Sequence, residues 1–115
     1  MAASKDPHAR LHHILDEATA IAEATRDLTF EAFNASWLDR RAVERGLMII
    51  SEASKALPSQ LKATQPRIPW ARIESLGNIL RHEYKDVDPE VLWGIIQHDL
   101  ASLMAAVRTI IELKK

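Results

Sequence analysis

Residues 88–110 read DPEVLWGIIQHDLASLMAAVRTI and carry the clearest helix signal in the chain. Asp88 can cap a helix with its side chain, and Pro89 suits the first helical position because the N–H it lacks would have no partner there. Apolar residues then recur at intervals of three and four from Val91 to Ile110, as the buried face of a helix requires. This stretch therefore predicts a long C-terminal helix with an apolar stripe.

The same pattern continues toward the N-terminus. Asp6-Pro7 predicts the start of a first helix, Thr29 can cap a short second one, and a longer helix is expected over residues 37–56. Prolines then interrupt the chain before a further helix that begins near Ile68. Because the chain has only three glycines and no sustained alternation of apolar and polar residues, we predict an all-α fold, an up-and-down bundle of four to five helices.

Length and composition narrow the class of protein. A chain of 115 residues corresponds to one domain, so we predict a flexible N-terminus over residues 1–7 and a single helical domain over residues 8–115. The absence of cysteine excludes disulfides and thiolate metal sites. We see no secretion signal and no apolar run of the roughly 20 residues that cross a bilayer, so we expect a cytoplasmic protein without a membrane contact. The net charge of −1 argues against a general, strongly basic nucleic-acid binder.

The candidate chemistry lies in residues 77–84, GNILRHEY. In a helix, Asn78 and His82 are one turn apart and share a face, and Arg81 lies about 100° round from His82. Imidazole can transfer protons near neutral pH, and a guanidinium can bind two phosphate oxygens at once. We therefore predict that Asn78, Arg81 and His82 act together in phosphate chemistry. The competing interpretation of His82 is a helix-end histidine that bonds to a neighbouring backbone or acidic group.

This stretch resembles the signature Arg-Asn-x-x-x-His-x-Tyr of the HepT-like branch of the HEPN superfamily, with Gly77 in place of the arginine. The similarity covers roughly residues 37–107, through residues 42–45, 49–53, 68–70, 87–88, Trp93 and 99–100. Within it, Ser51 replaces the glycine of the family's Gly-Glu-Ala pattern, which here includes Glu52.

The resemblance implies a HEPN-like bundle that acts as a bacterial toxin. It implies a metal-independent endoribonuclease that needs no cofactor and works as a homodimer. The implied partner is a minimal nucleotidyltransferase antitoxin, which silences the toxin by adding AMP to Tyr84. On this interpretation the RNA 2'-hydroxyl attacks the neighbouring phosphorus, His82 transfers a proton, and Arg81 and Asn78 stabilise the charge, leaving a 2',3'-cyclic phosphate.

Gly77 offers no side chain to hold a phosphate. Arg81 is four residues further on, about 40° round the helix and roughly 6 Å along it, so its long side chain could take over that role. We predict that Arg72, Arg81 and Lys85 contact RNA, although cations around the motif, Arg67 included, could equally form a solvated face. Two alternatives stay open: a catalytically silent module that binds RNA, a nucleotide or the nucleotidyltransferase, and a plain helical dimerisation module.

Three further groups of residues have simpler interpretations. His8 and His12 have a spacing that suits a metal, as do His12 and Asp16, but no third ligand is evident near them or His13, so we predict no metal site. The tryptophans are expected to anchor packing. They are Trp37, Trp70 and Trp93. Gly46 and Gly94 are expected to mark close helix approach, within the bundle or across a dimer.

Overall fold

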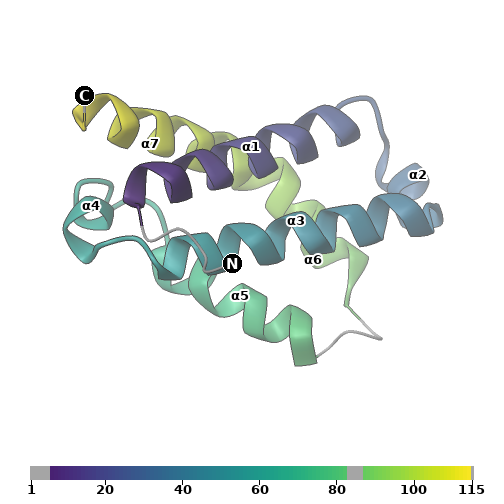
Figure 1. The fold of residues 1–115 in the computed structure, drawn as a ribbon. Coiled ribbons are helices and arrows are strands. Elements are labelled where there is room, and N and C mark those ends of the chain that lie inside the picture. Colours follow the sequence, from purple (N-terminus) through teal and green to yellow (C-terminus); the bar gives the residue numbers. More distant parts are fainter. Residues whose placement is uncertain (1–5, 83–86, 115) are drawn as a thin grey trace.

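The computed structural model describes residues 6–82 and 87–114, which fold into seven helices without a strand (Figure 1). The helices are α1 Pro7–Thr25, α2 Phe30–Ala35, α3 Trp37–Lys55, α4 Ser59–Ala63, α5 Trp70–His82, α6 Pro89–His98 and α7 Leu100–Leu113. The predicted all-α fold is confirmed. None of the helices in these two ranges is long and apolar enough to cross a membrane.

The bundle is organised around α3. Helix α1 packs antiparallel along one side of α3, α5 packs along another, and α7 covers α1 (Figure 1). Apolar side chains spaced three and four residues apart on these helices meet in a common core. Helices α2 and α6 add Phe33 and Leu92 to this core. The largest apolar side chains that are almost completely buried are Leu11, Ile14, Phe33, Val43, Leu47, Ile50, Leu92, Val107 and Ile110.

The predicted helix starts are confirmed by their capping bonds. Asp6 accepts a hydrogen bond from the N–H of His8 at 3.0 Å, Thr29 accepts one from Ala32 at 3.1 Å, and Asp88 accepts one from Glu90 at 2.9 Å. These bonds satisfy N–H groups that have no partner inside their own helix. Asp6 and Pro7 thus form the start of α1, while residues 1–5 lie outside the described residues.

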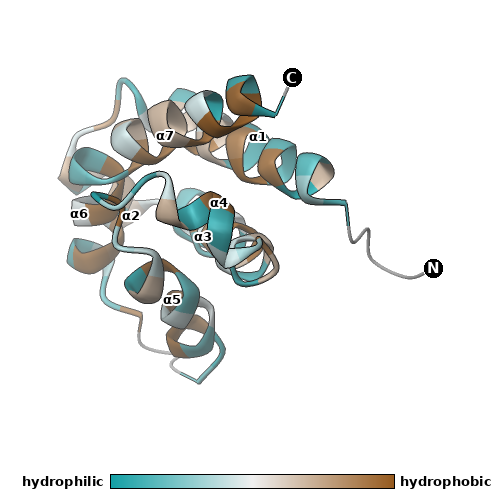
Figure 2. Ribbon diagram, turned by 90° about the vertical axis from the view of Figure 1, so that its left-hand side faces the viewer, coloured by the Kyte–Doolittle hydropathy of each residue, from teal (hydrophilic) through white to brown (hydrophobic). Residues whose placement is uncertain are grey.

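The single long C-terminal helix that we predicted is wrong, because the chain bends at Asp99 between α6 and α7. Asp99 has φ −115° and ψ −31°, well away from the φ of about −63° of a regular helix. Aspartate is a weak former of helix interiors, and the bend lets the two segments pack in different directions. Helix α6 lies against α2 while α7 runs along α1 (Figure 2).

Two of the three tryptophans anchor packing as predicted. Trp93 of α6 lies against the rings of Phe33 and Phe30 of α2, with ring centroids 5.3 Å and 6.2 Å apart. The Trp70 indole N–H lies 3.1 Å from the carbonyl oxygens of both Lys62 and Gln65, which fixes the start of α5 against the α4 segment. Trp37 is different, since 62% of it is exposed, and for this residue the packing prediction is wrong.

Helix α5 carries the motif and packs mainly against α3, standing away from α7 (Figure 2). Lys62 links the first half of α5 to α3, because its ammonium lies 2.8 Å from a Glu74 carboxylate oxygen and 3.1 Å from the carbonyl oxygen of Ser54. Ser51 of α3 links to the middle of α5 through hydrogen bonds to the backbone of Glu74 and Gly77. The last turn of α5 is thereby held in place, with Leu80 buried and the side chains of Ile79, Arg81 and His82 exposed.

Candidate active site at the end of α5

The three predicted catalytic residues lie on the last two turns of α5, and all three are exposed. His82 is the final residue of the helix, and Asn78 precedes it by one turn. Tyr84 and Lys85, predicted as the AMP acceptor and as an RNA contact, lie outside the described residues.

The structure brings Arg81 and Asn78 together. A guanidinium nitrogen of Arg81 lies 3.4 Å from the amide oxygen of Asn78, and another lies 3.6 Å from a carboxylate oxygen of Glu52 on α3. Both distances are long for strong contacts, and the Arg81 and Glu52 side chains are each about half exposed, at 48% and 49%. The guanidinium is therefore loosely held and can turn toward an incoming anion.

Glu52 is the carboxylate neighbour of this site. Its pKa is held below the ordinary glutamate value, chiefly by the hydrogen bond from Lys55. Burial opposes this shift, and the charges of Lys55 and Arg81 lower the pKa further. The Lys55 ammonium lies 2.9 Å from Glu52. Glu52 is thus a carboxylate shared between two cations, and its lowered pKa makes it a weaker base than an ordinary glutamate.

Gly77 lies on the opposite, buried side of this region, against α3. Its backbone N–H donates a hydrogen bond to the Ser51 hydroxyl at 2.9 Å, and that hydroxyl donates in turn to the carbonyl oxygen of Glu74 at 2.9 Å. A Cβ at position 77 would come within 2.7 Å of the Ser51 oxygen and 3.1 Å of its Cβ. A side chain at position 77 and the present Ser51 therefore compete for the same space.

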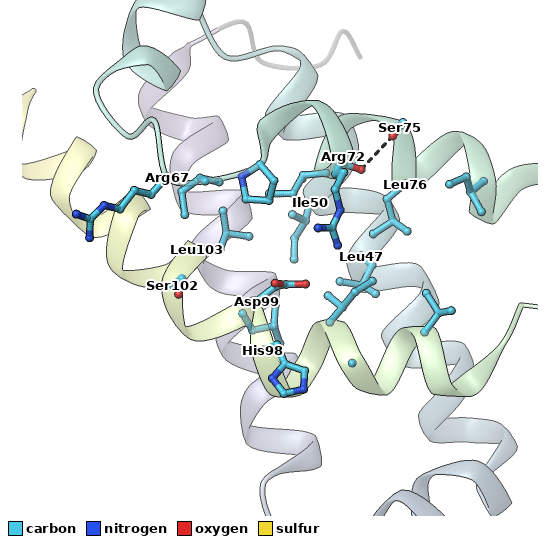
Figure 3. Close-up of a pocket in the computed structure, with 18 of the residues that line it drawn as sticks. Leu47, Ile50, Arg67, Arg72, Ser75, Leu76, His98, Asp99, Ser102 and Leu103 are labelled. Atoms are coloured by element: carbon cyan, nitrogen blue, oxygen red, sulfur yellow. Dashed lines mark hydrogen bonds between the residues drawn. The ribbon is translucent and has the colours of Figure 1, made fainter.

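Arg72 and Arg81, two of the predicted RNA contacts, face different sides of α5. Arg72 and Arg81 are nine residues apart, which places them about 180° apart around α5. Arg72 lines a cavity of about 570 Å³ between α5 and the α6–α7 region, together with Arg67, His98 and many apolar side chains (Figure 3). Arg81 instead lines a separate cavity of about 350 Å³ on the α1 side of α3. The sequence prediction grouped two arginines that face different hollows.

The N-terminal histidines do not assemble a metal centre in the described part of the chain. The rings of His8 and His12 stack edge to face with centroids 4.5 Å apart. Residues 6–82 and 87–114 contain no group of three or more histidine, aspartate or glutamate side chains placed to hold one metal ion. His13 lies elsewhere, in the lining of the smaller cavity.

Two cations of that smaller cavity, Arg10 of α1 and Arg45 of α3, were not singled out from the sequence. Their separation from Arg81 along the chain is large, so only the packing of α1 and α5 on α3 brings them near it. The sequence contains a partial signal that these arginines lie near helix contacts, because Arg10 directly precedes the buried Leu11 and Arg45 directly precedes the buried Gly46. The pattern alone does not say which helix edges meet.

The fold and site together define a small all-helical protein with an exposed Asn-Arg-His cluster at the end of one helix. A model of the family described as ribonuclease HepT-like matches residues 14–110, so the chain belongs to this family. It is 33% identical over 106 residues to a Methanocaldococcus jannaschii protein whose name marks it as a candidate RNase, covering 92% of this chain and 97% of the relative.

Two other relatives agree with that family. A Caldanaerobacter subterraneus protein, also named as a candidate RNase, is 32% identical over 111 residues, which cover 96% of this chain and 99% of the relative. A Thermococcus cleftensis protein named as a provisional ribonuclease HepT is 39% identical over 93 residues, covering 81% of this chain and 84% of the relative. No solved structure gives a significant match.

Proposed function

We propose that this chain is an endoribonuclease that cuts RNA without a metal ion, with His82, Arg81 and Asn78 as its catalytic residues. The observation that supports this most is the exposed cluster at the end of α5, where Arg81 contacts Asn78 at 3.4 Å next to His82. Family membership and relatives named as candidate RNases point to the same reaction.

The proposed reaction is an internal transfer of the phosphoryl group. The 2'-oxygen of a ribose bonds to the adjacent phosphorus as its proton passes to a base, and the bond from phosphorus to the 5'-oxygen of the next nucleotide breaks. A proton returns to that leaving oxygen. His82 transfers a proton, while the Arg81 guanidinium and the Asn78 amide stabilise the added negative charge on the phosphate oxygens. The products are a 2',3'-cyclic phosphate and a 5'-hydroxyl.

Arg81 takes the role of the arginine that the family signature places at position 77. The buried position of Gly77 against Ser51 favours this assignment, since position 77 has no room for a side chain and Arg81 lies on the open side of the same helix. The assignment of the signature arginine to position 77 is part of the proposal.

The biological setting that we propose is a toxin-antitoxin system in the cytoplasm. The chain would act as a toxin and as a homodimer, and a minimal nucleotidyltransferase antitoxin would silence it by adding AMP to Tyr84. Support for the dimer comes from the 570 Å³ cavity (Figure 3), whose largely apolar lining includes the exposed side chains of Ile79 and Val91, at 52% and 54%. A second copy would cover this surface.

The experiment that tests the reaction is incubation of the purified chain with end-labelled RNA in excess chelator, followed by analysis of the fragment ends. We expect fragments whose 3' ends resist labelling until the cyclic phosphate is removed. Fragments that appear only when a divalent metal is restored would contradict the metal-free reaction, and uncut RNA would contradict nuclease activity as a whole.

A second candidate function is a catalytically silent module that binds RNA, a nucleotide or the nucleotidyltransferase. The occupation of the space at position 77 by Ser51 favours it, because the usual arginine has no place there. The two candidates predict different results when the chain is expressed without a partner. The nuclease should slow growth through His82, whereas the silent module should leave growth unchanged.

A further inference from the structure

A cavity of about 350 Å³ opens between α1, α3 and the end of α5, next to the proposed active site. Basic side chains from all three helices line it: Arg10 and His13 from α1, Arg45 from α3 and Arg81 from α5. The other described residues in its lining are Met48, Ile49, Glu52 and Ala53, all from α3. The cavity thus joins the helix of the proposed catalytic residues to two helices that carry none of them.

The helical repeat explains why these side chains converge. Arg10 and His13 are three residues apart on α1, and Arg45, Met48 and Glu52 follow intervals of three and four on α3, so each set occupies one helix face. Because α1 and α5 both pack on α3, those faces turn toward the same hollow. Arg81 lines the same cavity from the third helix, α5.

Among residues 6–82 and 87–114, the side chains that line this cavity carry an excess of positive charge. Three of these described residues are arginines and one is a carboxylate, Glu52, which is already shared between Lys55 at 2.9 Å and Arg81 at 3.6 Å. Neither Arg10 nor Arg45 forms an ion pair with a carboxylate among residues 6–82 and 87–114, and the guanidinium of Arg45 lies 3.8 Å from the Met48 sulfur. Cations gathered in one hollow repel each other, and an anion between them would relieve that cost.

We propose that this cavity binds a phosphate group of the RNA strand, next to the phosphate that is cut. Arg10 and Arg45 would hold that second phosphate. His13 and Arg81 belong to the same lining, and Arg81 directly precedes His82 in the chain. Guanidinium groups suit this task because they donate two parallel hydrogen bonds to phosphate oxygens. The proposal deepens the ribonuclease function, on which it rests, by giving the strand a fixed path across α1 and α3 to the end of α5.

The test is the affinity of the full chain for a short fluorescent single-stranded RNA, measured by anisotropy at several salt concentrations. His82→Ala serves as the background so that the probe stays intact. Arg10→Gln and Arg45→Gln each remove one cavity cation. Arg108→Gln is the matched control, because Arg108 is exposed on α7 and lines neither cavity.

We expect each cavity variant to weaken RNA binding roughly tenfold, as for loss of a hydrogen-bonded charge, and Arg108→Gln to change it little. The slope of log affinity against log salt should become shallower by about 0.7 for each phosphate that is no longer neutralised. Arg45→Lys should bind better than Arg45→Gln because it keeps the charge. The proposal is overturned if the cavity variants, folded as shown by an unchanged melting temperature, bind RNA as tightly as Arg108→Gln.

RNA cleavage by the wild-type chain separates this proposal from the ribonuclease proposal. If RNA binding depends on Arg10 and Arg45 but the wild type does not cleave RNA, the ribonuclease proposal is refuted and the phosphate site is supported. If the wild type cleaves RNA but its RNA affinity does not change when Arg10 or Arg45 is replaced, the phosphate site is refuted and the ribonuclease proposal is supported.

Discussion

Ser51 and Gly77 are joined across the interface of α3 and α5, with the Gly77 N–H donating to the Ser51 hydroxyl at 2.9 Å. A Cβ at position 77 would lie only 2.7 Å from that hydroxyl oxygen. The family resemblance implies glycine at position 51 and arginine at position 77, and we propose that the two positions have exchanged their large and small residues. On this proposal, the space between α3 and α5 is filled from α3 here and from α5 in the usual pattern.

We predict that Gly77→Arg alone destabilises the fold by about 1–3 kcal/mol, because the new side chain meets Ser51. Adding Ser51→Gly should recover part of this loss. Urea denaturation of the two single variants and the double variant measures the coupling between the positions. Ser51→Ala is the control, since it removes the hydroxyl but keeps the Cβ, which would lie 3.1 Å from a Cβ at position 77. Additive changes in unfolding free energy would contradict the exchange.

Arg81 and Arg72 offer a direct comparison because they lie on opposite sides of α5. We expect Arg81→Ala to lower the rate of RNA cleavage by about a hundredfold, the size typical of losing one group that stabilises developing charge. Arg72→Ala should affect cleavage much less, since Arg72 lines the other cavity. Single-turnover cleavage rates measure both. Equal losses, or no loss in Arg81→Ala beside an inactive His82→Ala, would refute the relocation of the arginine to position 81.

Glu52 should weaken RNA binding by competing with phosphate for Arg81. We therefore expect Glu52→Gln to tighten binding by a few-fold, within the range of an exposed ion pair. Glu44→Gln is the matched control, because Glu44 pairs with Arg41 and lies outside both cavities. Anisotropy with fluorescent RNA measures the change. Weaker binding in Glu52→Gln would mean that Glu52 positions Arg81 for its task.

The same carboxylate predicts a small pH dependence of stability. Because the folded chain lowers the pKa of Glu52, ionised Glu52 stabilises the fold above its unfolded pKa, and this contribution is lost as the pH falls through its lower folded pKa. The exposure of the side chain limits the contribution to about 0.3 kcal/mol. Unfolding free energies of the wild type and Glu52→Gln should therefore differ slightly at neutral pH and converge in acid. A difference that grows in acid would contradict this sign.

Ile79 tests the proposed dimer surface. This side chain is 52% exposed and lines the 570 Å³ cavity, so a charge at this position would face a second copy seated there. We expect Ile79→Asp to shift the chain from dimer to monomer in size-exclusion chromatography with light scattering. Leu113→Asp is the control, since Leu113 is 63% exposed near the end of α7 and lines neither cavity. A dimer that survives Ile79→Asp would place its interface elsewhere.

Local signals in the sequence predicted the parts of this fold that depend on local interactions. The caps at Asp6, Thr29 and Asp88 each bond within three residues, so the sequence alone could locate them. The bend at Asp99 could not be located in this way, since its benefit comes from packing α6 and α7 against different helices. The exposure of Trp37 could not be predicted for a similar reason, because nothing in its own helix determines whether a neighbouring element covers it.

The candidate site likewise has one part that helical spacing predicts and one part that depends on how the helices pack. The proximity of Asn78 and Arg81 follows from helical spacing and was predictable. The convergence of Arg10 and Arg45 on Arg81 depends on how three helices pack, which no spacing within one helix reveals. The close approach at Gly46, where a Cβ would meet Ile21 at 2.8 Å, and the open space at Gly94 show that identical residues in similar helices can have opposite surroundings.

Cleavage of RNA by the wild type, His82→Ala and His8→Ala in excess chelator tests whether His82 carries out metal-free catalysis at the end of α5. His8 is an exposed histidine at the start of α1 that lines neither cavity, so its loss controls for removing a histidine. We expect equal cleavage by the wild type and His8→Ala, with cyclic-phosphate ends, and none by His82→Ala. Cleavage that persists in folded His82→Ala would contradict the assignment of catalysis to the end of α5.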